Sequence, residues 1–354
     1  MIKARVIGAG GYGGAGIIDL LLNHPEAEVV DVVDVENVGM SIADKFPHLK
    51  GFCDLTIKAP DDASWEKGAV DVVFTATPDG VGMRYAQQCV DSGAKLIDFS
   101  GDFRFNTLDA YAKYAERIGR EQDHLAPDLL GESAYGLTEL HRDAISKVNI
   151  VGNPGCFAVS TILGLAPAVK AGLVDPSTLI ADAKTGISGA GIKPAATFHY
   201  PSRYENMNAY KIAKHQHCIE VERELGLLAG LDDMPMTLTT QVVPLCRGIM
   251  NCLYGKLQNQ STSSKDVYEA YREFYKGSSF VRVMPASGTA SNNDVRGSNF
   301  CVIWVNVDDR TGTMIVISHI DNLVKGQAGS ALQNMNVLFG LDEGMGLKRP
   351  AFYP

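Results

Sequence analysis

Residues 3–14 read KARVIGAGGYGG, in which a short β-forming run leads directly into a glycine-rich turn. Apolar residues then recur at helical spacing over 15–22. The glycines satisfy Gly-x-Gly-x-x-Gly at positions 8, 10 and 13, and also Gly-x-x-Gly-x-x-Gly at positions 8, 11 and 14. A strand, a glycine turn and a helix in this order are typical of a pyrophosphate cradle, because backbone N–H groups at the helix start can approach the phosphates closely. The residues predicted to form the cradle are Gly8, Gly10, Gly11, Tyr12, Gly13 and Gly14.

Strand and helix patterns alternate from this turn to about residue 151, which predicts a parallel, doubly wound sheet. From about 178 to 320 the strand patterns no longer alternate regularly with helix patterns, which predicts a mostly antiparallel sheet. Residues 322–338 have helical spacing. The expected fold class is therefore α/β, with a Rossmann-type dinucleotide-binding domain and an α+β substrate and dimerisation domain. The expected boundaries are 1–152 for the dinucleotide-binding domain, 153–320 for the catalytic and substrate domain, and 321–354 for a C-terminal helix that returns to the first domain.

The bulk composition argues against several classes of protein. The 354 residues carry a formal net charge of −9 with no Lys/Arg-rich run, which argues against a nucleic-acid partner. No stretch approaches the roughly 20 apolar residues of a membrane span, and the N-terminus lacks a signal-peptide pattern, so we expect a cytoplasmic protein. The seven cysteines are an odd number without a CxxC pair, which is poor material for a disulfide framework or a zinc site.

Cys156 is the cysteine with unusual neighbours. A β-rich run ends at Val151, the turn Gly152-Asn153-Pro154-Gly155 follows, and 156–168 has the pattern of an apolar helix. A thiol in the first turn of a helix meets free N–H groups and the positive end of the helix dipole, which lower its pKa and favour the nucleophilic thiolate. The alternative is a buried cysteine that only packs at a helix start.

A thiolate enzyme also needs a proton carrier, and His215-Gln216-His217 contains the one close pair of histidines. Side chains two residues apart are expected to diverge, so only one of the two would face the nucleophile. A metal site is the alternative, but no further ligand follows at metal spacing, so we expect no metal. Arg104 and Arg247 are candidate anion-binding groups, with a surface arginine as the alternative for each.

Asp34 and Glu36 stand at the end of the second predicted strand, and no Lys or Arg follows until Lys45. An acidic residue here usually accepts a hydrogen bond from the ribose 2′-hydroxyl and repels a 2′-phosphate. The local residues therefore favour NAD, with a solvated strand end as the alternative.

These segments together resemble the N-acetyl-gamma-glutamyl-phosphate reductases, relatives of aspartate-semialdehyde dehydrogenase, over nearly the whole chain. No single segment is decisive, but eight of them in the family's order are specific. The segments are Gly8–Gly14, Asp98–Arg104 (DFSGDFR), Ala134–Glu139 (AYGLTE), Gly152–Phe157 (GNPGCF), Gly186–Gly191 (GISGAG), Lys214–His217 (KHQH), Arg247–Ile249 (RGI) and Asp321–Ala328 (DNLVKGQA).

The resemblance implies NADPH-dependent reduction of N-acetyl-gamma-glutamyl phosphate to N-acetyl-glutamate semialdehyde, a step of arginine biosynthesis. Cys156 would expel phosphate and carry the acyl group as a thioester, and His217, or alternatively His215, would be the general acid and base. A homo-oligomer, either dimer or tetramer, is also implied. Further cofactor contacts implied by the resemblance are Ser188, Gly189, Asn322 and Lys325. The implied substrate contacts are Arg104, Asn153 and Arg247.

The chain departs from the family pattern at several positions. Gln216 stands where the family usually has the Arg of His-Arg-His, and Ile192 stands where it has Arg after Ser-Gly-Ala-Gly. Because both changes remove anion-binding donors, a related reductase acting on aspartyl or aminoadipyl phosphate is an alternative. Asp34 also departs from the pattern, so NAD is an alternative to the expected NADP. A nucleotide sensor without catalysis is a third reading, which Cys156 in its turn argues against.

Overall fold

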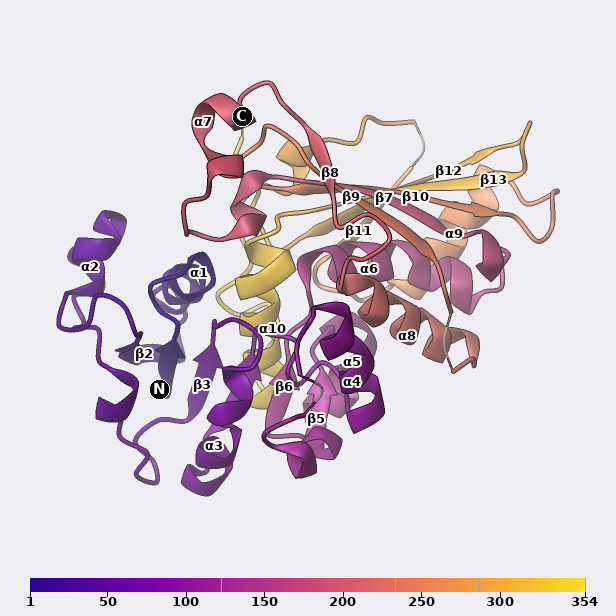
Figure 1. Ribbon diagram of the computed structural model, residues 1–354. Helices are drawn as coiled ribbons and strands as arrows, with labels where there is room; N and C mark the ends of the chain where they lie inside the picture. The colour runs from indigo at the N-terminus through magenta and orange to yellow at the C-terminus, as the bar shows by residue number, and fades with distance from the viewer. Residues whose placement is uncertain (122, 233, 286, 354) are drawn as a thin grey trace. The chain divides into compact units, whose positions relative to one another are not determined.

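The computed structural model describes residues 1–121, 123–232, 234–285 and 287–353, and the chain forms two units (Figure 1). Unit 1 comprises Met1–Gly155 and Gln327–Lys348. Unit 2 comprises Cys156–Gly326 and the residues from Arg349 onward. The polypeptide therefore leaves unit 1 immediately before Cys156 and re-enters it after Gly326.

Unit 1 contains a six-stranded sheet and the helices that cover it. Its strands are β1 (Ile2–Ile7), β2 (Ala27–Val33), β3 (Val72–Thr75), β4 (Lys95–Asp98), β5 (Ser133–Tyr135) and β6 (Ile150–Gly152). Its helices are α1 (Tyr12–Leu21), α2 (Ile42–Lys45), α3 (Ala86–Ser92), α4 (Leu108–Arg117), α5 (Thr138–Ile145) and α10 (Gly329–Leu338).

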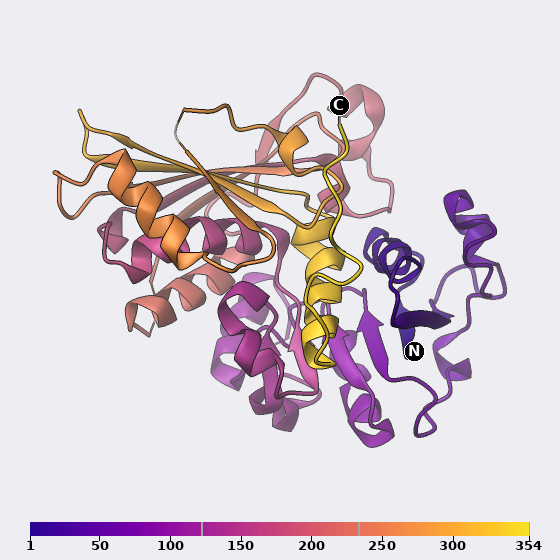
Figure 2. The same cartoon turned by 180° about the vertical axis from the view of Figure 1, so that it is seen from behind.

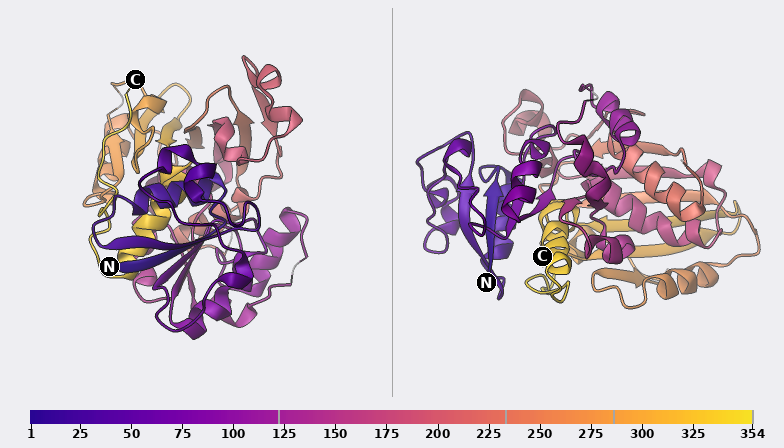
Figure 3. Two further views of the ribbon diagram at one scale, coloured as in Figure 1. Left: turned by 90° about the vertical axis from the view of Figure 1, so that its left-hand side faces the viewer. Right: turned by 90° about the horizontal axis from the view of Figure 1, so that it is seen from below.

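The strand order of this sheet is β2-β1-β3-β4-β6-β5, and every neighbouring pair is parallel. The chain moves outward from β1 to β2 and in the opposite direction from β3 to β4. Right-handed crossovers therefore place α1 and α3 on opposite faces of the sheet (Figure 3). Ligands of doubly wound sheets bind at the carboxyl ends of the strands where the order reverses, which here is between β1 and β3.

Helix α10 returns to unit 1 and packs on α1, α5 and β4 (Figure 2). All ten of its residues are buried, although several are polar. The Asn334 amide donates to the carbonyl of Gly136 (2.8 Å) and accepts from the hydroxyl of Thr138 (2.8 Å). Such hydrogen bonds explain how a helix with polar side chains is stable without contact with water.

Unit 2 contains a seven-stranded mixed sheet in the order β11-β12-β13-β10-β7-β9-β8. Its strands are β7 (Ile180–Thr185), β8 (Asn208–Tyr210), β9 (Thr237–Val242), β10 (Ile249–Lys256), β11 (Val281–Met284), β12 (Cys301–Asp308) and β13 (Thr313–Ile320). Its helices are α6 (Cys156–Lys170), α7 (Tyr200–Arg203), α8 (His217–Ala229) and α9 (Ser264–Phe274). The neighbours β7–β9 and β11–β12 are parallel, so the sheet is antiparallel only in its other pairings.

Helix α6 packs on β10, β12 and β13, α9 packs on β11 and β12, and α8 packs on α6. These three helices lie on the same side of the sheet (Figures 1 and 2). Pro167 inside α6 has no N–H for the carbonyl of Leu163, and the hydroxyl of Tyr275 donates to that carbonyl instead. This contact secures a helix whose residues 157–169 are all buried.

The predicted fold class is confirmed: a parallel dinucleotide-type sheet, a second α+β unit and a C-terminal helix that returns to the first unit. Within the described part of the chain, no helix has the length and apolar character to cross a membrane. The same residues contain no group of three or more His, Cys, Asp or Glu side chains arranged to hold a metal ion.

Candidate active site

Cys156 is the first residue of α6, at the position where the sequence predicts that a helix begins. Its side chain is half-buried, whereas the next thirteen residues are buried, so the thiol lies at the accessible end of an enclosed helix. Gly326 lies directly against it, because a Cβ added to Gly326 would come 2.7 Å from Cys156 Cβ. The N–H groups of a helix start and a backbone segment without a side chain therefore both adjoin the thiol.

The two histidines predicted to carry protons lie together next to this helix start. His215 and His217 are both buried, and their ring centroids are 4.6 Å apart. The ring of Phe157, the residue after Cys156, lies 5.3 Å from His215 and 6.1 Å from His217. The prediction that the two side chains diverge was wrong. His215 precedes α8 and folds back over its first turn, so that its Nδ1 accepts the backbone N–H of His217 (3.2 Å).

A buried carboxylate accompanies the second histidine. Glu220 lies one turn further along α8, and its Oε1 is 4.0 Å from His217 Nε2. Its side chain is fully buried. Little water reaches this carboxylate, so it can form an ion pair with the imidazole when the ring carries a proton.

Tyr210 is a site residue that the sequence did not indicate. It ends the three-residue strand β8, and its ring lies 5.6 Å from that of His215. Burial, and then the negative charge of Cys156, raise the pKa of the Tyr210 hydroxyl. The Tyr210 phenol therefore lies near the sulfur of Cys156. A strand of three residues leaves no periodic pattern by which it could be predicted.

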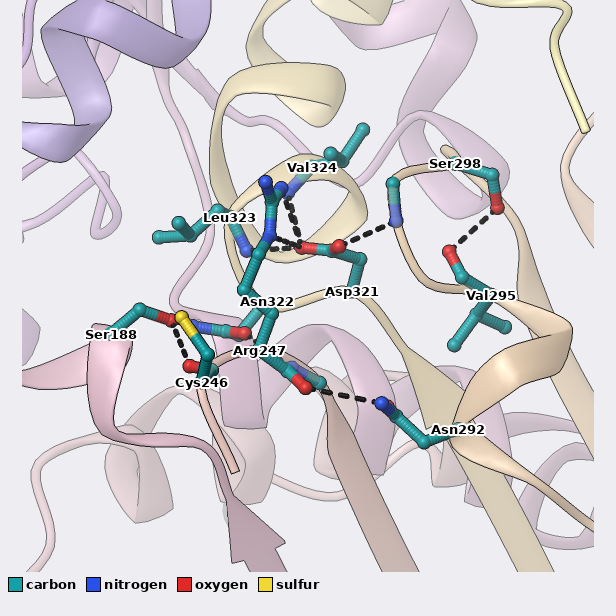
Figure 4. Close-up of polar contacts among 12 residues, drawn as sticks. Ser188, Cys246, Arg247, Asn292, Val295, Ser298, Asp321, Asn322, Leu323 and Val324 are labelled. Atoms are coloured by element: carbon teal, nitrogen blue, oxygen red, sulfur yellow. Dashed lines mark hydrogen bonds and ion pairs between the residues drawn. The ribbon is translucent and has the colours of Figure 1, made fainter. Parts of the chain in front are cut away.

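Arg247 is part of a second group of polar side chains in unit 2 (Figure 4). Its Nη2 donates to Asp321 Oδ1 (3.1 Å), and its side chain is 32% exposed whereas that of Asp321 is fully buried. Asp321 also accepts the backbone N–H groups of Leu323 (2.8 Å) and Gly297 (2.7 Å). The carboxylate thus holds the guanidinium at the start of the segment that leads to Gly326, and leaves part of it accessible.

Asn322 connects the loop of Ser188 with the loop of Arg247, as Figure 4 shows. Its Nδ2 donates to Ser188 Oγ (3.0 Å), and its Oδ1 accepts the N–H of Gly248 (2.7 Å). A Cβ at Gly189 would lie 3.8 Å from Asn322 Nδ2, so Gly189 belongs to the same group. The structure therefore brings together three of the predicted cofactor residues of unit 2 with one predicted substrate residue.

Lys325, the fourth predicted cofactor residue of unit 2, is completely buried in the π-helix Val324–Ala328. Its ammonium lies 5.9 Å from the ring of Phe280. Single π-helical turns are uncommon and occur frequently at functional sites. This turn also contains Gly326, the residue against Cys156.

In unit 1 the glycine turn joins β1 to α1 as predicted. Gly8 adopts a φ of 81°, and a Cβ there would lie 2.5 Å from the carbonyl oxygen of Ala76. A Cβ at Gly14 would lie 2.3 Å from the carbonyl oxygen of Gly8. Gly11 is the N-cap of α1 and makes no side-chain cap, and the first turn contains no acidic residue. The helix start thus offers N–H groups to an anion, which fits a dinucleotide pyrophosphate.

Asp34 has a different surrounding from the one expected. Its Oδ2 accepts the N–H of Gly10 (2.8 Å), and its Oδ1 accepts the N–H of Glu36 (3.0 Å). A Cβ at Gly10 would meet Asp34 Oδ2 at 2.9 Å and Lys45 Cε at 3.1 Å. The carboxylate therefore anchors the glycine turn, and the distance of eleven residues in sequence concealed that Lys45 stands beside it.

Arg104 and Asn153, predicted to contact substrate, form hydrogen bonds within unit 1. The buried guanidinium of Arg104 donates to the carbonyls of Asn153 (2.8 Å) and Phe99 (2.7 Å). The Asn153 amide donates to the carbonyl of Gln327 (3.0 Å). Burial, followed by the charge of Asp102, raises the pKa of Asp98, whose backbone carbonyl accepts the N–H of Asn153. These contacts fix the backbone of the turn that precedes α6.

The chain is similar to proteins of known activity over its full length. Residues 3–148 match the family model described as "Semialdehyde dehydrogenase, NAD binding domain", and residues 156–322 match "Semialdehyde dehydrogenase, dimerisation domain". It is 41% identical to the N-acetyl-gamma-glutamyl-phosphate reductase of Citrifermentans bemidjiense, covering 100% of both chains. It is 38% identical to the protein of the same name from Bacillus cereus, covering 99% of this chain and 100% of that one.

Two solved structures show the same fold at low sequence identity. Aspartate semialdehyde dehydrogenase II from Vibrio cholerae has a TM-score of 0.73 at 14% identity, covering 96% of this chain and 99% of that chain. Aspartate semialdehyde dehydrogenase with NADP from Candida albicans has a TM-score of 0.66 at 17% identity, covering 96% and 98%.

Proposed function

The chain belongs to the N-acetyl-gamma-glutamyl-phosphate reductase family of semialdehyde dehydrogenases, and from this premise we propose that it works through a Cys156 thioester with NADPH as the reductant. Its reaction is the reduction of N-acetyl-gamma-glutamyl phosphate to N-acetyl-glutamate semialdehyde and phosphate, in arginine biosynthesis. The observation that carries the mechanism is the position of Cys156, half-buried at the start of α6, with two imidazoles packed on the adjacent Phe157.

In the first step the Cys156 thiolate attacks the carbonyl carbon, a C–S bond forms, and the bond to the phosphate oxygen breaks. The imidazolium of His217 donates its proton to the departing phosphate, so that hydrogen phosphate leaves and an acyl thioester stays on Cys156. When bound, the reduced nicotinamide supplies the hydride that reduces the thioester carbon. The C–S bond then breaks, the aldehyde leaves, and Cys156 is again a thiolate. His217 regains its proton from solvent.

His217 is the proton carrier in this proposal, and His215 is a positioning residue. The Nδ1 of His215 accepts the backbone N–H of His217, so this nitrogen takes up no proton while the hydrogen bond is present. Protonation of His215 would break that hydrogen bond. The ring of His217 lies beside the buried carboxylate of Glu220, which can pair with the imidazolium that donates the proton.

NADP is the proposed cofactor, with its pyrophosphate on the glycine turn of 8–14. The hydrogen bonds of Asp34 to two backbone N–H groups occupy part of the carboxylate that would otherwise receive a ribose hydroxyl. Lys45 places a cation next to Gly10, where it can offset that carboxylate and receive a 2′-phosphate. NAD is the alternative that Asp34 supports. Ser188, Gly189, Asn322 and Lys325 are the proposed contacts of unit 2 with the cofactor.

Arg247, Arg104 and Asn153 are the proposed substrate contacts. Arg247 is the best placed of the three, because Asp321 fixes its guanidinium while about a third of the side chain stays exposed. Arg104 also donates to the carbonyl of Asn153 in the turn 152–155, and the Asn153 amide donates to the carbonyl of Gln327, so both side chains fix the turn as well. We propose that residues 1–152 bind the cofactor, that 153–320 contain the catalytic groups, and that 321–354 return the chain to the first domain.

A homo-oligomer is proposed to form through the sheet of unit 2. Gly164 of α6 lies against Leu253, since a Cβ there would be 2.2 Å from Leu253 Cδ1, so the covered face carries Leu253. Side chains alternate along a strand, so Tyr254 and Cys252 of β10 face the opposite side, and Ile317 of β13 shares that side because it pairs with Cys252. Tyr254 and Ile317 are both half-buried, and an apolar row on a sheet face suits a second copy of the chain. We also propose a cytoplasmic location for the protein.

The function is tested by phosphate-dependent oxidation of N-acetyl-glutamate semialdehyde, with NADP and NAD supplied separately. We expect activity that requires phosphate and is faster with NADP. Aspartate semialdehyde serves as the competing substrate, because a related acyl-phosphate reductase is the alternative function. Activity on aspartate semialdehyde alone would show that the assigned substrate is wrong. The reaction type, reduction of an acyl phosphate to an aldehyde, would still stand.

A further inference from the structure

Arg203 is a charged side chain in unit 2 that the proposed mechanism does not use. It is the last residue of α7 and is only 8% exposed. Its Nη2 donates to Asn208 Oδ1 at 2.6 Å, while Nε and Nη1 have no hydrogen-bond partner. Among the residues for which the structure gives positions, no carboxylate is within ion-pair distance of it. A guanidinium removed from water in this way is costly unless an anion accepts its free N–H groups.

The surroundings of Arg203 relate it to the nucleophile through β8. Asn208, which holds the guanidinium, and Tyr210 are two residues apart on this strand, so their side chains lie on the same face. The separation along the strand is roughly 7 Å. Tyr210 contacts the ring of His215 and lies near Cys156. The Arg203 guanidinium is therefore on the same side of β8 as Tyr210 and the groups near Cys156. The separation from Tyr210 along the strand corresponds to about the length of a short acyl chain.

Arg203 also differs from Arg247 in its charge environment. Arg247 is paired with the buried carboxylate of Asp321, so its charge is already matched within unit 2. Within the described part of the chain, the Arg203 side chain donates only to the neutral amide of Asn208. A planar guanidinium binds the two oxygens of a carboxylate along one edge, through Nη2 together with either Nε or Nη1. Asn208 accepts one N–H of Nη2, so the second N–H of Nη2 and a free neighbour remain for a carboxylate.

We propose that Arg203 binds the carboxylate of the substrate, at the end of the molecule remote from the acyl phosphate, and that Asn208 orients the guanidinium for this contact. This inference rests on the proposed function, since it assigns a contact to the same substrate. It makes Arg203 a specificity-determining residue, because an acyl phosphate without a carboxylate at that end would leave the buried charge unmatched.

The test compares wild type with Arg203→Met and Arg203→Lys in the phosphate-dependent oxidation of N-acetyl-glutamate semialdehyde. Arg310→Met is the matched control, because Arg310 is an exposed arginine of the same unit. We expect the KM for the aldehyde to rise about 10- to 100-fold in Arg203→Met and less in Arg203→Lys. The KM for phosphate, the rate of Cys156 alkylation by iodoacetamide, and the control variant should be unchanged.

Two results would overturn the proposal. A rise in the KM for phosphate instead of the aldehyde would place the phosphate at Arg203, and an unchanged aldehyde KM in a folded Arg203→Met variant would make the residue structural. If Arg203→Met fails to fold, Arg203→Lys and Asn208→Ala decide by the same comparison of KM values.

An inactive wild type would refute the proposed function separately. Calorimetry with N-acetylglutamate would then test Arg203 alone, because wild type should bind this carboxylate and Arg203→Met should not.

Discussion

His217 as proton carrier and His215 as positioning residue predict different effects of replacing them, the first on kcat and the second on stability. His217→Gln removes the proton carrier but keeps the residue's size and helix start, so kcat should fall about 10²- to 10⁴-fold with little change in thermal stability. His215→Ala removes the acceptor of an N–H in the first turn of α8. A lost helix cap of this kind costs about 1 kcal/mol, and loss of the packed ring adds to it. Its melting temperature should therefore fall by several degrees.

The conservative variant His215→Asn separates the two roles. The Asn side chain can accept the same backbone N–H but cannot carry a proton at neutral pH, so stability and most of the kcat should be retained. The assay is steady-state kinetics across pH together with thermal unfolding of all three variants. A His215→Asn variant as inactive as His217→Gln, but fully stable, would refute the assignment and make His215 the proton carrier.

Three further predictions concern the cofactor, acid stability and assembly. Lys45→Met should raise the KM for NADP about tenfold and leave that for NAD unchanged, whereas an equal effect on both cofactors would remove Lys45 from the 2′-phosphate site. Burial lowers the pKa of His319 from 6.5 to about 4, so the folded state disfavours a proton that the unfolded chain binds. The free energy of unfolding should therefore be intact above about pH 6.5 and fall by about 3 kcal/mol as the pH drops to 4. Urea unfolding of His319→Leu should show a smaller loss of this free energy between pH 6.5 and 4. Ile317→Glu should shift the protein toward monomer in analytical ultracentrifugation, and an unchanged mass would exclude this sheet face as the interface.

The parts of the fold that depend on local signals could be predicted. The β-run, glycine turn and helical spacing of 3–22 predicted the dinucleotide-type unit, and the turn of 152–155 predicted a helix that starts at Cys156. Each signal lies within about twenty consecutive residues, where periodicity and turn chemistry are informative. Strands β5 and β8 were missed because three residues do not establish an alternation.

The parts of the site that depend on long-range contacts could not be predicted. Gly326 reaches Cys156 across 170 positions of sequence, and Tyr210 approaches His215 through a strand that had no pattern. The expectation for the histidines failed because a side-chain cap, rather than helical geometry, sets the direction of His215. Asp34 was identified at the right strand end, but the N–H of Gly10 that it accepts becomes adjacent only in the folded turn.

The central claim is that Cys156 carries the acyl group, and intact-mass spectrometry tests it most directly. Wild type incubated with N-acetyl-gamma-glutamyl phosphate in the absence of NADPH should gain the mass of one N-acetyl-glutamyl group, which hydroxylamine removes, and peptide mapping should place it on Cys156. Cys156→Ala should gain no mass and should lose the reduction of the acyl phosphate. An adduct on another residue, or full activity in Cys156→Ala, would contradict the thioester mechanism.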